Sequence, residues 1–178
     1  NILKMLAMPP LPAIIRRPME KLDALLFDFD GVVADTESQY TRFWNGVAER
    51  YGAAGGGDFA LRIKGTPLKR ILAERFAHLG AGCLAEISES LSEFEKRLSF
   101  EPVKGAVEFI SAARGRGYKT ALVTSSGAEK MRRAFASTGY GKLFDALVTA
   151  EDIERGKPDP MCYLAAAAKL GSEPRRCA

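Results

Sequence analysis

Histidine and cysteine are scarce in this chain of 178 residues, which has one histidine, His78, and three cysteines. We expect His78 to be a surface or half-buried helix residue, so a serine-hydrolase triad would lack its usual base, and one histidine cannot supply a multi-histidine metal site. The cysteines are odd in number, widely spaced and free of any Cys-x-x-Cys pair: Cys83, Cys162 and Cys177. This pattern argues against a disulfide framework or a zinc site and predicts a reducing, cytoplasmic location.

Long apolar runs and concentrated charge are also missing. The net charge is +4, but the basic residues are scattered, which predicts no nucleic-acid partner. The stretch 1–18 is too short and too interrupted by proline to span a membrane, and it lacks the order of a secretory signal. We expect it to be a poorly ordered extension, with Met19 as a candidate start, and we expect no membrane partner. Composition leaves the oligomeric state open.

Residues 24–37 carry the strongest signal in the chain. An apolar run ends in two aspartates, Asp28 and Asp30, and Gly31 follows at once. If the run is a β-strand, side-chain alternation puts both carboxylates on one side, at the strand end where α/β sheets bind ligands. Two crowded carboxylates repel each other, so a structural role seldom needs such a pair. A divalent cation with a phosphorylated substrate would explain them, so we predict a catalytic site.

Strands and helices alternate along most of the chain. Periodicity and turn residues predict strands at 22–27, 118–123 and 144–148. The helices predicted between and after them cover 105–114, 128–137 and 160–170. This alternation predicts an α/β fold with a doubly wound parallel sheet, Rossmann-like, carrying helices on both faces.

A block of helices interrupts the alternation after the first strand. Its apolar spacing predicts three helices, at 38–51, 68–79 and 84–98, with a flexible connection at 53–57. We therefore divide the chain into an extension (1–18), an α/β core domain (19–35 and 101–178) and an inserted all-helical cap (36–100). An insertion at this point overhangs the carboxyl end of the first strand, where a lid belongs.

Hydroxyl side chains follow the second predicted strand. Thr124, Ser125 and Ser126 stand between that strand and a predicted helix, and hydroxyls with free backbone N–H groups there make an anion site. We expect Thr124 to bind phosphate and Ser126 only to cap the helix. Lys157 lies between Gly156 and Pro158, so its backbone is stiffly held, and its charge could neutralise a carboxylate and an incoming phosphate.

These elements, in this order, resemble the haloacid dehalogenase-like hydrolase superfamily, in its β-phosphoglucomutase-like and phosphatase branch with a small helical cap. Residues 28–32 match its first motif, Thr124 its second, and Lys157 with Pro158 its third. The resemblance implies that Asp28 is a nucleophile forming an aspartyl-phosphate and that Asp30 is the general acid and base. It also implies Mg²⁺ bound by the Asp28 carboxylate and the Asp30 carbonyl, with Thr124, the Ser125 amide and Lys157 binding phosphate.

Two departures from the family pattern shape the expected function. Its fourth motif, an acidic strand end that completes the magnesium ligands, is not met before Ala178, so we expect the C-terminal part of the core to be missing. Tyr40 stands where the mutases usually have histidine, and Leu68 lies near the place of their phosphate-gripping arginine. The resemblance therefore favours Mg²⁺-dependent hydrolysis of a small phosphorylated metabolite, such as a sugar phosphate.

Two alternatives stay open. One is a β-phosphoglucomutase-like phosphosugar mutase, and the other is a non-catalytic relative that only binds ligand. Lys64 and Gly65, in the predicted cap, are candidates for substrate contact, although Lys64 fits a surface lysine equally well.

Overall fold

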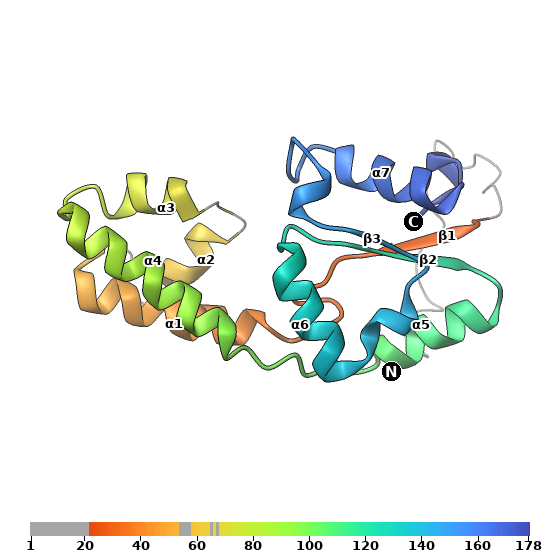
Figure 1. Cartoon of the computed structure of the whole chain (residues 1–178), viewed down its shortest axis with the longest axis horizontal. Helices are drawn as coiled ribbons and strands as arrows, with labels where there is room; N and C mark the ends of the chain where they lie inside the picture. The colour runs from red at the N-terminus through yellow and green to blue at the C-terminus, as the bar shows by residue number, and fades with distance from the viewer. Residues whose placement is uncertain (1–21, 54–57, 65, 67) are drawn as a thin grey trace, which may run out of the picture.

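The computed structural model of this chain describes residues 22–53, 58–64, 66 and 68–178. Figure 1 shows two parts side by side: a sheet flanked by helices, and a separate group of helices. The elements in chain order are β1 (Ala24–Phe27), α1 (Glu37–Tyr51), α2 (Phe59–Ile63), α3 (Leu68–Arg75), α4 (Ala81–Lys96), α5 (Ala106–Gly115), β2 (Lys119–Val123), α6 (Ala128–Thr138), β3 (Ala146–Val148) and α7 (Met161–Leu170).

The sheet has three strands in the order β1-β2-β3, and both pairings are parallel. Phe27 pairs with Leu122, and Val123 pairs with Val148, so the carboxyl ends of the strands meet at one edge. The central strand β2 is buried from its second residue to its last. A continuous apolar run is what a parallel strand covered on both faces requires.

Helices cover both faces of this sheet. On one face, α5 and α6 enclose an apolar cluster that includes Phe29, Ile110, Leu122 and Met131. On the other face, α7 packs its alanine-rich side against β1, β2 and β3 through a second cluster. Figure 1 shows α7 on the opposite side of the strands from α5 and α6. The predicted doubly wound α/β fold is confirmed.

The remaining helices, α1 to α4, form what we call the helical insertion (Glu37–Lys96). It has its own apolar cluster, in which Trp44, Phe59, Phe76 and Ile87 are buried. Helices α1, α3 and α4 lie where periodicity predicted helices, whereas α2 was missed because five residues are too few to show a period. Helix α3 ends at Arg75, earlier than expected, and His78 follows it as an exposed turn residue.

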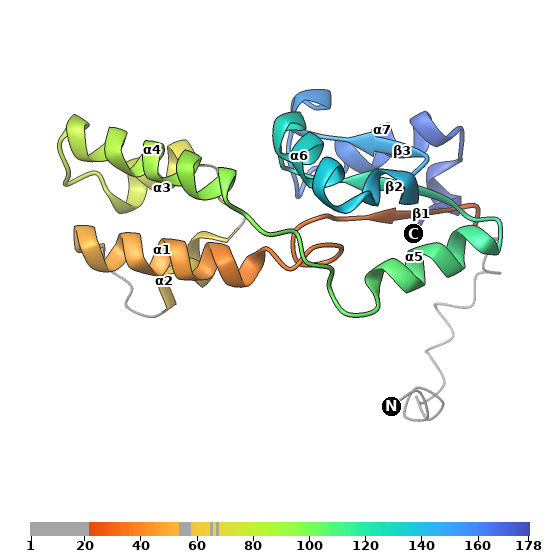
Figure 2. The ribbon, with the colours of Figure 1, turned by 60° about the horizontal axis from the view of Figure 1, so that its bottom comes forward.

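Two segments of the chain connect the insertion to the sheet part, as Figure 2 shows. They run side by side: the amide of Asp35 donates to the Glu101 carbonyl at 2.8 Å, and that of Val103 donates to Val33 at 3.0 Å. The Gln39 side chain adds a clasp, because its amide donates to the Ser99 carbonyl at 2.9 Å and accepts from the Ser99 amide at 3.0 Å. These two hydrogen-bonded segments are the connection about which the insertion would turn, and we call them the hinge.

Some expectations lie outside the described residues or stay untested. The extension 1–18, Met19, Gly65 and most of the connection 53–57 belong to the first group. The domain boundaries and the cytoplasmic location stay predictions. Among the residues that the structure describes, no helix combines the length and apolar character needed to cross a membrane.

Candidate active site

Asp28 stands directly after β1, and two groups hold its carboxylate. Oδ1 accepts a hydrogen bond from the Phe29 amide at 2.8 Å, and Oδ2 lies 2.9 Å from the Lys157 ammonium. Phe29 is fully buried and packs against Phe100, with ring centroids 5.9 Å apart, so it anchors this segment in the core. The Asp28 side chain remains 40% exposed, as a group that meets a substrate must be.

Lys157 joins Asp28 to the end of the neighbouring strand. Its ammonium donates to the Val123 carbonyl at 3.1 Å as well as pairing with Asp28. Burial alone would lower the pKa of Lys157, but the hydrogen bond and charge of Asp28 outweigh it and raise the pKa above its usual value. Lys157 therefore keeps its positive charge at the carboxyl ends of β1 and β2, where the sequence placed it.

Asp30 is held by three side chains. Its Oδ1 accepts from the Thr36 hydroxyl at 2.5 Å and from the Lys130 ammonium at 2.7 Å. Its Oδ2 accepts from the Ser126 hydroxyl at 2.8 Å. Ser126 was expected only to cap α6, and that expectation is wrong: Gly127 is the residue at the cap position, and the Ser126 hydroxyl binds Asp30 instead.

Gly31 turns the chain immediately after Asp30. Its φ is +76°, a conformation that residues with a side chain rarely adopt. A Cβ here would stand 2.6 Å from Cδ of Glu37, the first residue of α1. The turn thus brings the start of the helical insertion against the aspartate motif.

Thr124 and Ser125 lie at the end of β2 but differ in exposure. Thr124 is 1% exposed, and its hydroxyl accepts from the Ser126 amide at 3.0 Å. Ser125 is exposed, and its backbone N–H donates to none of the residues that the structure describes. Through Ser126, this strand end is connected to Asp30.

The first amide of α6 is not free to bind an anion, contrary to the sequence-based expectation of open amides there. The Ala128 N–H donates to both carboxylate oxygens of Glu151, each at 3.0 Å. This hydrogen bond lowers the pKa of Glu151, and the positive end of the helix favours the same charged form. The Ala128 amide is therefore not available to a phosphate at this edge, whereas the Ser125 amide, which donates to none of the described residues, is available.

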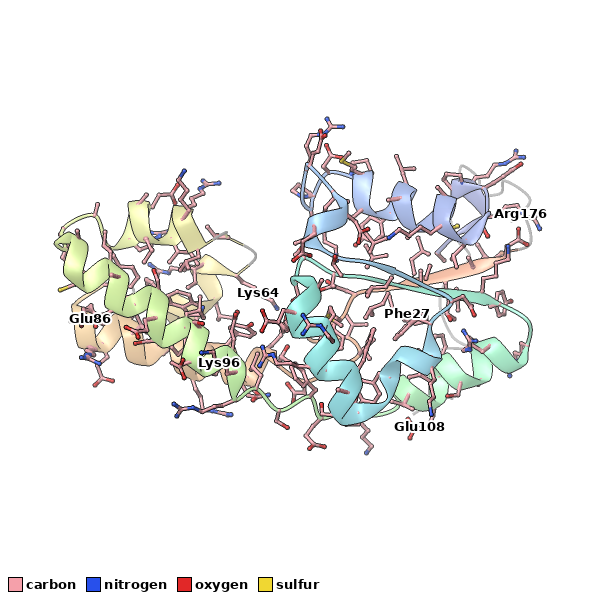
Figure 3. All side chains as sticks on the ribbon, in the orientation of Figure 1. Phe27, Lys64, Glu86, Lys96, Glu108 and Arg176 are labelled. Atoms are coloured by element: carbon pink, nitrogen blue, oxygen red, sulfur yellow. The ribbon has the colours of Figure 1, made fainter. Side chains whose placement is uncertain are left out.

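Lys64 lies at the edge of the insertion that faces the sheet part, as Figure 3 shows, whereas Glu86 lies on the insertion farther from it. The Lys64 ammonium is 2.6 Å from Oε1 and 2.7 Å from Oε2 of Glu37, the residue whose side chain lies against Gly31. The structure thus places Lys64 beside the aspartate motif, as a candidate for substrate contact must be. Gly65 lies outside the described residues.

Three residues that sequence reasoning missed belong to this site. Thr36, Lys130 and Glu151 were not singled out from the sequence, and they contact Asp30 or the start of α6. Lys130 does stand one helical turn after Ser126, a spacing that puts two side chains on one helix face. That spacing was the available signal, but it does not say that the face meets Asp30.

The oxygen atoms at the end of β1 suit Mg²⁺. Among the described residues no three His, Cys, Asp or Glu side chains cluster as a metal site. Mg²⁺ needs fewer protein ligands, because it keeps several waters and commonly binds one or two carboxylates plus substrate phosphate. The Asp28 carboxylate is partly exposed, and none of the described residues donates a hydrogen bond to the Asp30 backbone carbonyl. These two oxygens fit the ion.

Comparison with known proteins assigns this arrangement to a family. Residues 22–178 match haloacid dehalogenase-like hydrolase. The chain belongs to this family, and the expected enzyme class is confirmed.

Two curated relatives are phosphatases. One is a phosphorylated carbohydrates phosphatase of Thermotoga maritima, 32% identical over 168 residues that cover 87% of this chain and 74% of that protein. The other is a fructose-1-phosphate phosphatase of Escherichia coli, 29% identical and covering 89% of this chain and 85% of that protein. The crystal structure of a candidate β-phosphoglucomutase from Thermotoga maritima superposes with a TM-score of 0.68, at 28% identity over 88% of this chain and 74% of that one.

Proposed function

We propose that this protein is a Mg²⁺-dependent phosphomonoester hydrolase that acts on a small sugar phosphate. The observation that carries the proposal is the pairing of Asp28 with Lys157 at the edge where β1 and β2 end, beside Thr124. A carboxylate beside a fixed ammonium and a hydroxyl at a strand end is suited to receive a phosphoryl group. The family membership and the two phosphatase relatives support the same activity.

Asp28 is the nucleophile in this proposal. Its carboxylate oxygen attacks phosphorus, the bond to the sugar oxygen breaks, and an aspartyl-phosphate forms. Lys157, the Thr124 hydroxyl and the Ser125 amide bind the phosphoryl oxygens, over which negative charge spreads in the transition state. Mg²⁺, held by the Asp28 carboxylate and the Asp30 carbonyl, would offset the repulsion between the carboxylate and the phosphate.

Asp30 moves the protons. Its carboxyl group donates a proton to the departing sugar oxygen and then, as a carboxylate, takes one from the water that hydrolyses the aspartyl-phosphate. The water attacks phosphorus, the bond to Asp28 breaks, and inorganic phosphate leaves. Both proton transfers involve the one side chain, so Asp30 returns to its starting form after each turnover.

The helical insertion would act as the cap that selects the sugar. Lys64 is its candidate contact, because it lies beside Glu37 and Gly31 at the mouth of the site. Its charge is already matched by Glu37 in this structure, so Lys64 does not offer an unpaired cation to a second phosphate. This favours a substrate with one phosphate and hydrolysis over phosphoryl transfer between two positions of a bisphosphate.

Phosphate release tests the proposal. The purified protein would be assayed with p-nitrophenyl phosphate and a panel of sugar phosphates, with Mg²⁺ and again with excess EDTA. We expect Mg²⁺-dependent release that Asp28→Asn lowers by at least about 1,000-fold, because the nucleophile is gone. Asp58→Asn, an exposed carboxylate at the start of α2, is the matched control and should keep wild-type turnover.

Two results would contradict the proposal. Normal turnover in Asp28→Asn would refute the aspartyl-phosphate route. Conversion of a sugar 1-phosphate to its isomer without net phosphate release would identify a mutase instead.

A further inference from the structure

Lys130 is a buried lysine on α6 whose ammonium has a full set of partners. Its side chain is 9% exposed, and its three N–H groups find three oxygens: Asp30 Oδ1 at 2.7 Å, Ser126 Oγ at 3.0 Å and Tyr40 Oη at 3.2 Å. A lysine ammonium has three donors and no more. Lys130 therefore has no donor left for a substrate, unlike Lys157 and Lys64, which are the candidates for substrate contact.

Burying the Lys130 ammonium would be energetically unfavourable without those partners. A buried ammonium loses its hydration, and only close oppositely charged and polar groups make up for it. Neighbouring residues on the same helix, Met131 and Ala134, are apolar and buried in the cluster against the sheet. If the Lys130 ammonium separated from Asp30 but stayed buried, its lost hydration would no longer be compensated.

One of the three partners belongs to the helical insertion. Tyr40 lies on α1 and donates its own hydroxyl proton to Glu95 of α4 at 2.8 Å, so it accepts from Lys130. Burial and the Glu95 charge raise the pKa of the Tyr40 phenol far above its usual range, which keeps this proton in place. The ammonium also lies 5.0 Å from the centroid of the Tyr40 ring.

A second contact joins the same helix to the same part of the insertion. Arg133, one turn after Lys130, donates to the Glu95 backbone carbonyl at 2.8 Å. Helix α6 thus meets the insertion at two points, and only the Lys130 contact continues to Asp30. The chain of hydrogen bonds runs from Glu95 through Tyr40 and Lys130 to Asp30.

We infer that Lys130 is a positioning residue, which orients the Asp30 carboxylate and makes that orientation depend on where the helical insertion lies. The inference rests on the proposed function, because it gives Asp30 a proton-transfer task whose geometry matters. When Tyr40 is in place, Lys130 is fixed between Tyr40 and Ser126 and draws Asp30 Oδ1 to one position. When the insertion moves away, the ammonium loses one of three partners, and Asp30 loses its fixed neighbour.

Steady-state kinetics of four single variants and one double variant tests this role, with sugar phosphate or p-nitrophenyl phosphate as substrate and thermal unfolding measured alongside. Lys130→Met keeps the unbranched apolar part of the side chain and removes the ammonium. We expect its kcat to fall roughly 10- to 100-fold while KM changes less than about threefold, because a general acid and base is misplaced but the phosphate ligands are intact. Lys130→Arg keeps the charge and should recover at least about half of that loss on a logarithmic scale.

Tyr40→Phe removes only the oxygen that connects Lys130 to the insertion. We expect a smaller fall in kcat, and no further fall when Tyr40→Phe is added to Lys130→Met, because both changes interrupt one chain of hydrogen bonds. Lys119→Met is the matched control: that ammonium donates to the Leu170 carbonyl at 2.6 Å, away from the aspartates, and its loss should leave kcat unchanged.

Each result decides between the possibilities. An active wild-type protein with unchanged kcat in Lys130→Met overturns the role of Lys130 alone. Equal loss of kcat and of thermal stability in Lys130→Met and Lys130→Arg makes Lys130 a structural residue and also overturns it. Unchanged kcat in Tyr40→Phe removes the dependence on the insertion. A wild-type protein inactive on the whole panel overturns the hydrolase proposal first, and the Lys130 role with it.

Discussion

Gly31→Ala tests how the chain turns after the aspartate motif. The φ of Gly31 is +76°, and a Cβ added there would stand 2.6 Å from Cδ, 2.7 Å from Oε1 and 2.8 Å from Cγ of Glu37. A Cβ essentially never approaches a non-bonded heavy atom so closely, so the Glu37 side chain has to move away. Glu37 then gives up its ion pair with Lys64, whose nitrogen lies 2.6 Å from Oε1.

Two contributions set the size of the effect. Holding alanine in the left-handed region costs about 1–2 kcal/mol. The Glu37–Lys64 pair is half exposed on both sides, so its loss adds at most about 1 kcal/mol. We therefore expect the free energy of unfolding to fall by about 1–3 kcal/mol, which equilibrium urea unfolding resolves.

The two contributions can be separated by removing the obstacle. In a Glu37→Ala background the three atoms nearest to the new Cβ are gone, so Gly31→Ala should cost mainly the backbone part, about 1–2 kcal/mol. Gly46→Ala is the matched control, because Gly46 lies inside α1 with nothing within 4 Å of an added Cβ. It should raise stability by about 0.5–1 kcal/mol. A Gly31→Ala protein as stable as wild type would refute the geometry described for this turn.

Three further predictions concern stability and the hinge. Burial would raise the pKa of Asp145, but the backbone hydrogen bond from Thr120 and the pairing with Arg114 outweigh it and lower the pKa below 3.8. The ionised Asp145 therefore stabilises the folded protein above that pH, and this contribution is lost as the pH falls through the folded-state pKa. Asp145→Asn should therefore lower stability in urea at pH 7 by about 1 kcal/mol and by less near pH 3; equal losses at both would contradict this. Ile87→Ala, at a fully buried site of the insertion, should cost about 2–5 kcal/mol, and a loss under about 1 would contradict its place in that core. Gln39→Ala removes both hydrogen bonds of the clasp on Ser99, so amide exchange of Ser99 should quicken severalfold, and unchanged exchange would show that the clasp does not form.

Much of the sheet part could be predicted because its signals are local. The apolar run 24–27, its two aspartates and the glycine after them specify a strand, a site and a turn within eight residues. Alternating strands and helices then leave few topologies, so the parallel order of β1, β2 and β3 follows from handedness and short connections. Asp28 follows β1 and Lys157 lies in the loop after β3, and both strands end at the same edge of the parallel sheet, which agrees with their pairing.

The partners of Asp30 could not be predicted in this way. Ser126 has the sequence position of a cap, and Lys130 has the look of a charged residue on an exposed helix face. Their actual roles depend on how α6 is rotated against β1, which is decided by the packing of Met131 and Ala134. The Glu151 carboxylate at the start of α6 is a contact of the same kind, made across 23 residues. Long-range packing, rather than local propensity, determines such contacts.

The separate apolar cluster of the helical insertion bears on how this protein can change. Because α1 to α4 bury a cluster of their own, exposed positions of the insertion can change without altering that cluster or the two clusters on the sheet; Tyr40 and Phe94 are not such positions, because they pack against the sheet-side cluster. Under the proposed function, a library of variants at such exposed positions should therefore yield folded proteins that differ in substrate preference and keep Asp28. New specificity can arise in the insertion while the chemistry is inherited unchanged.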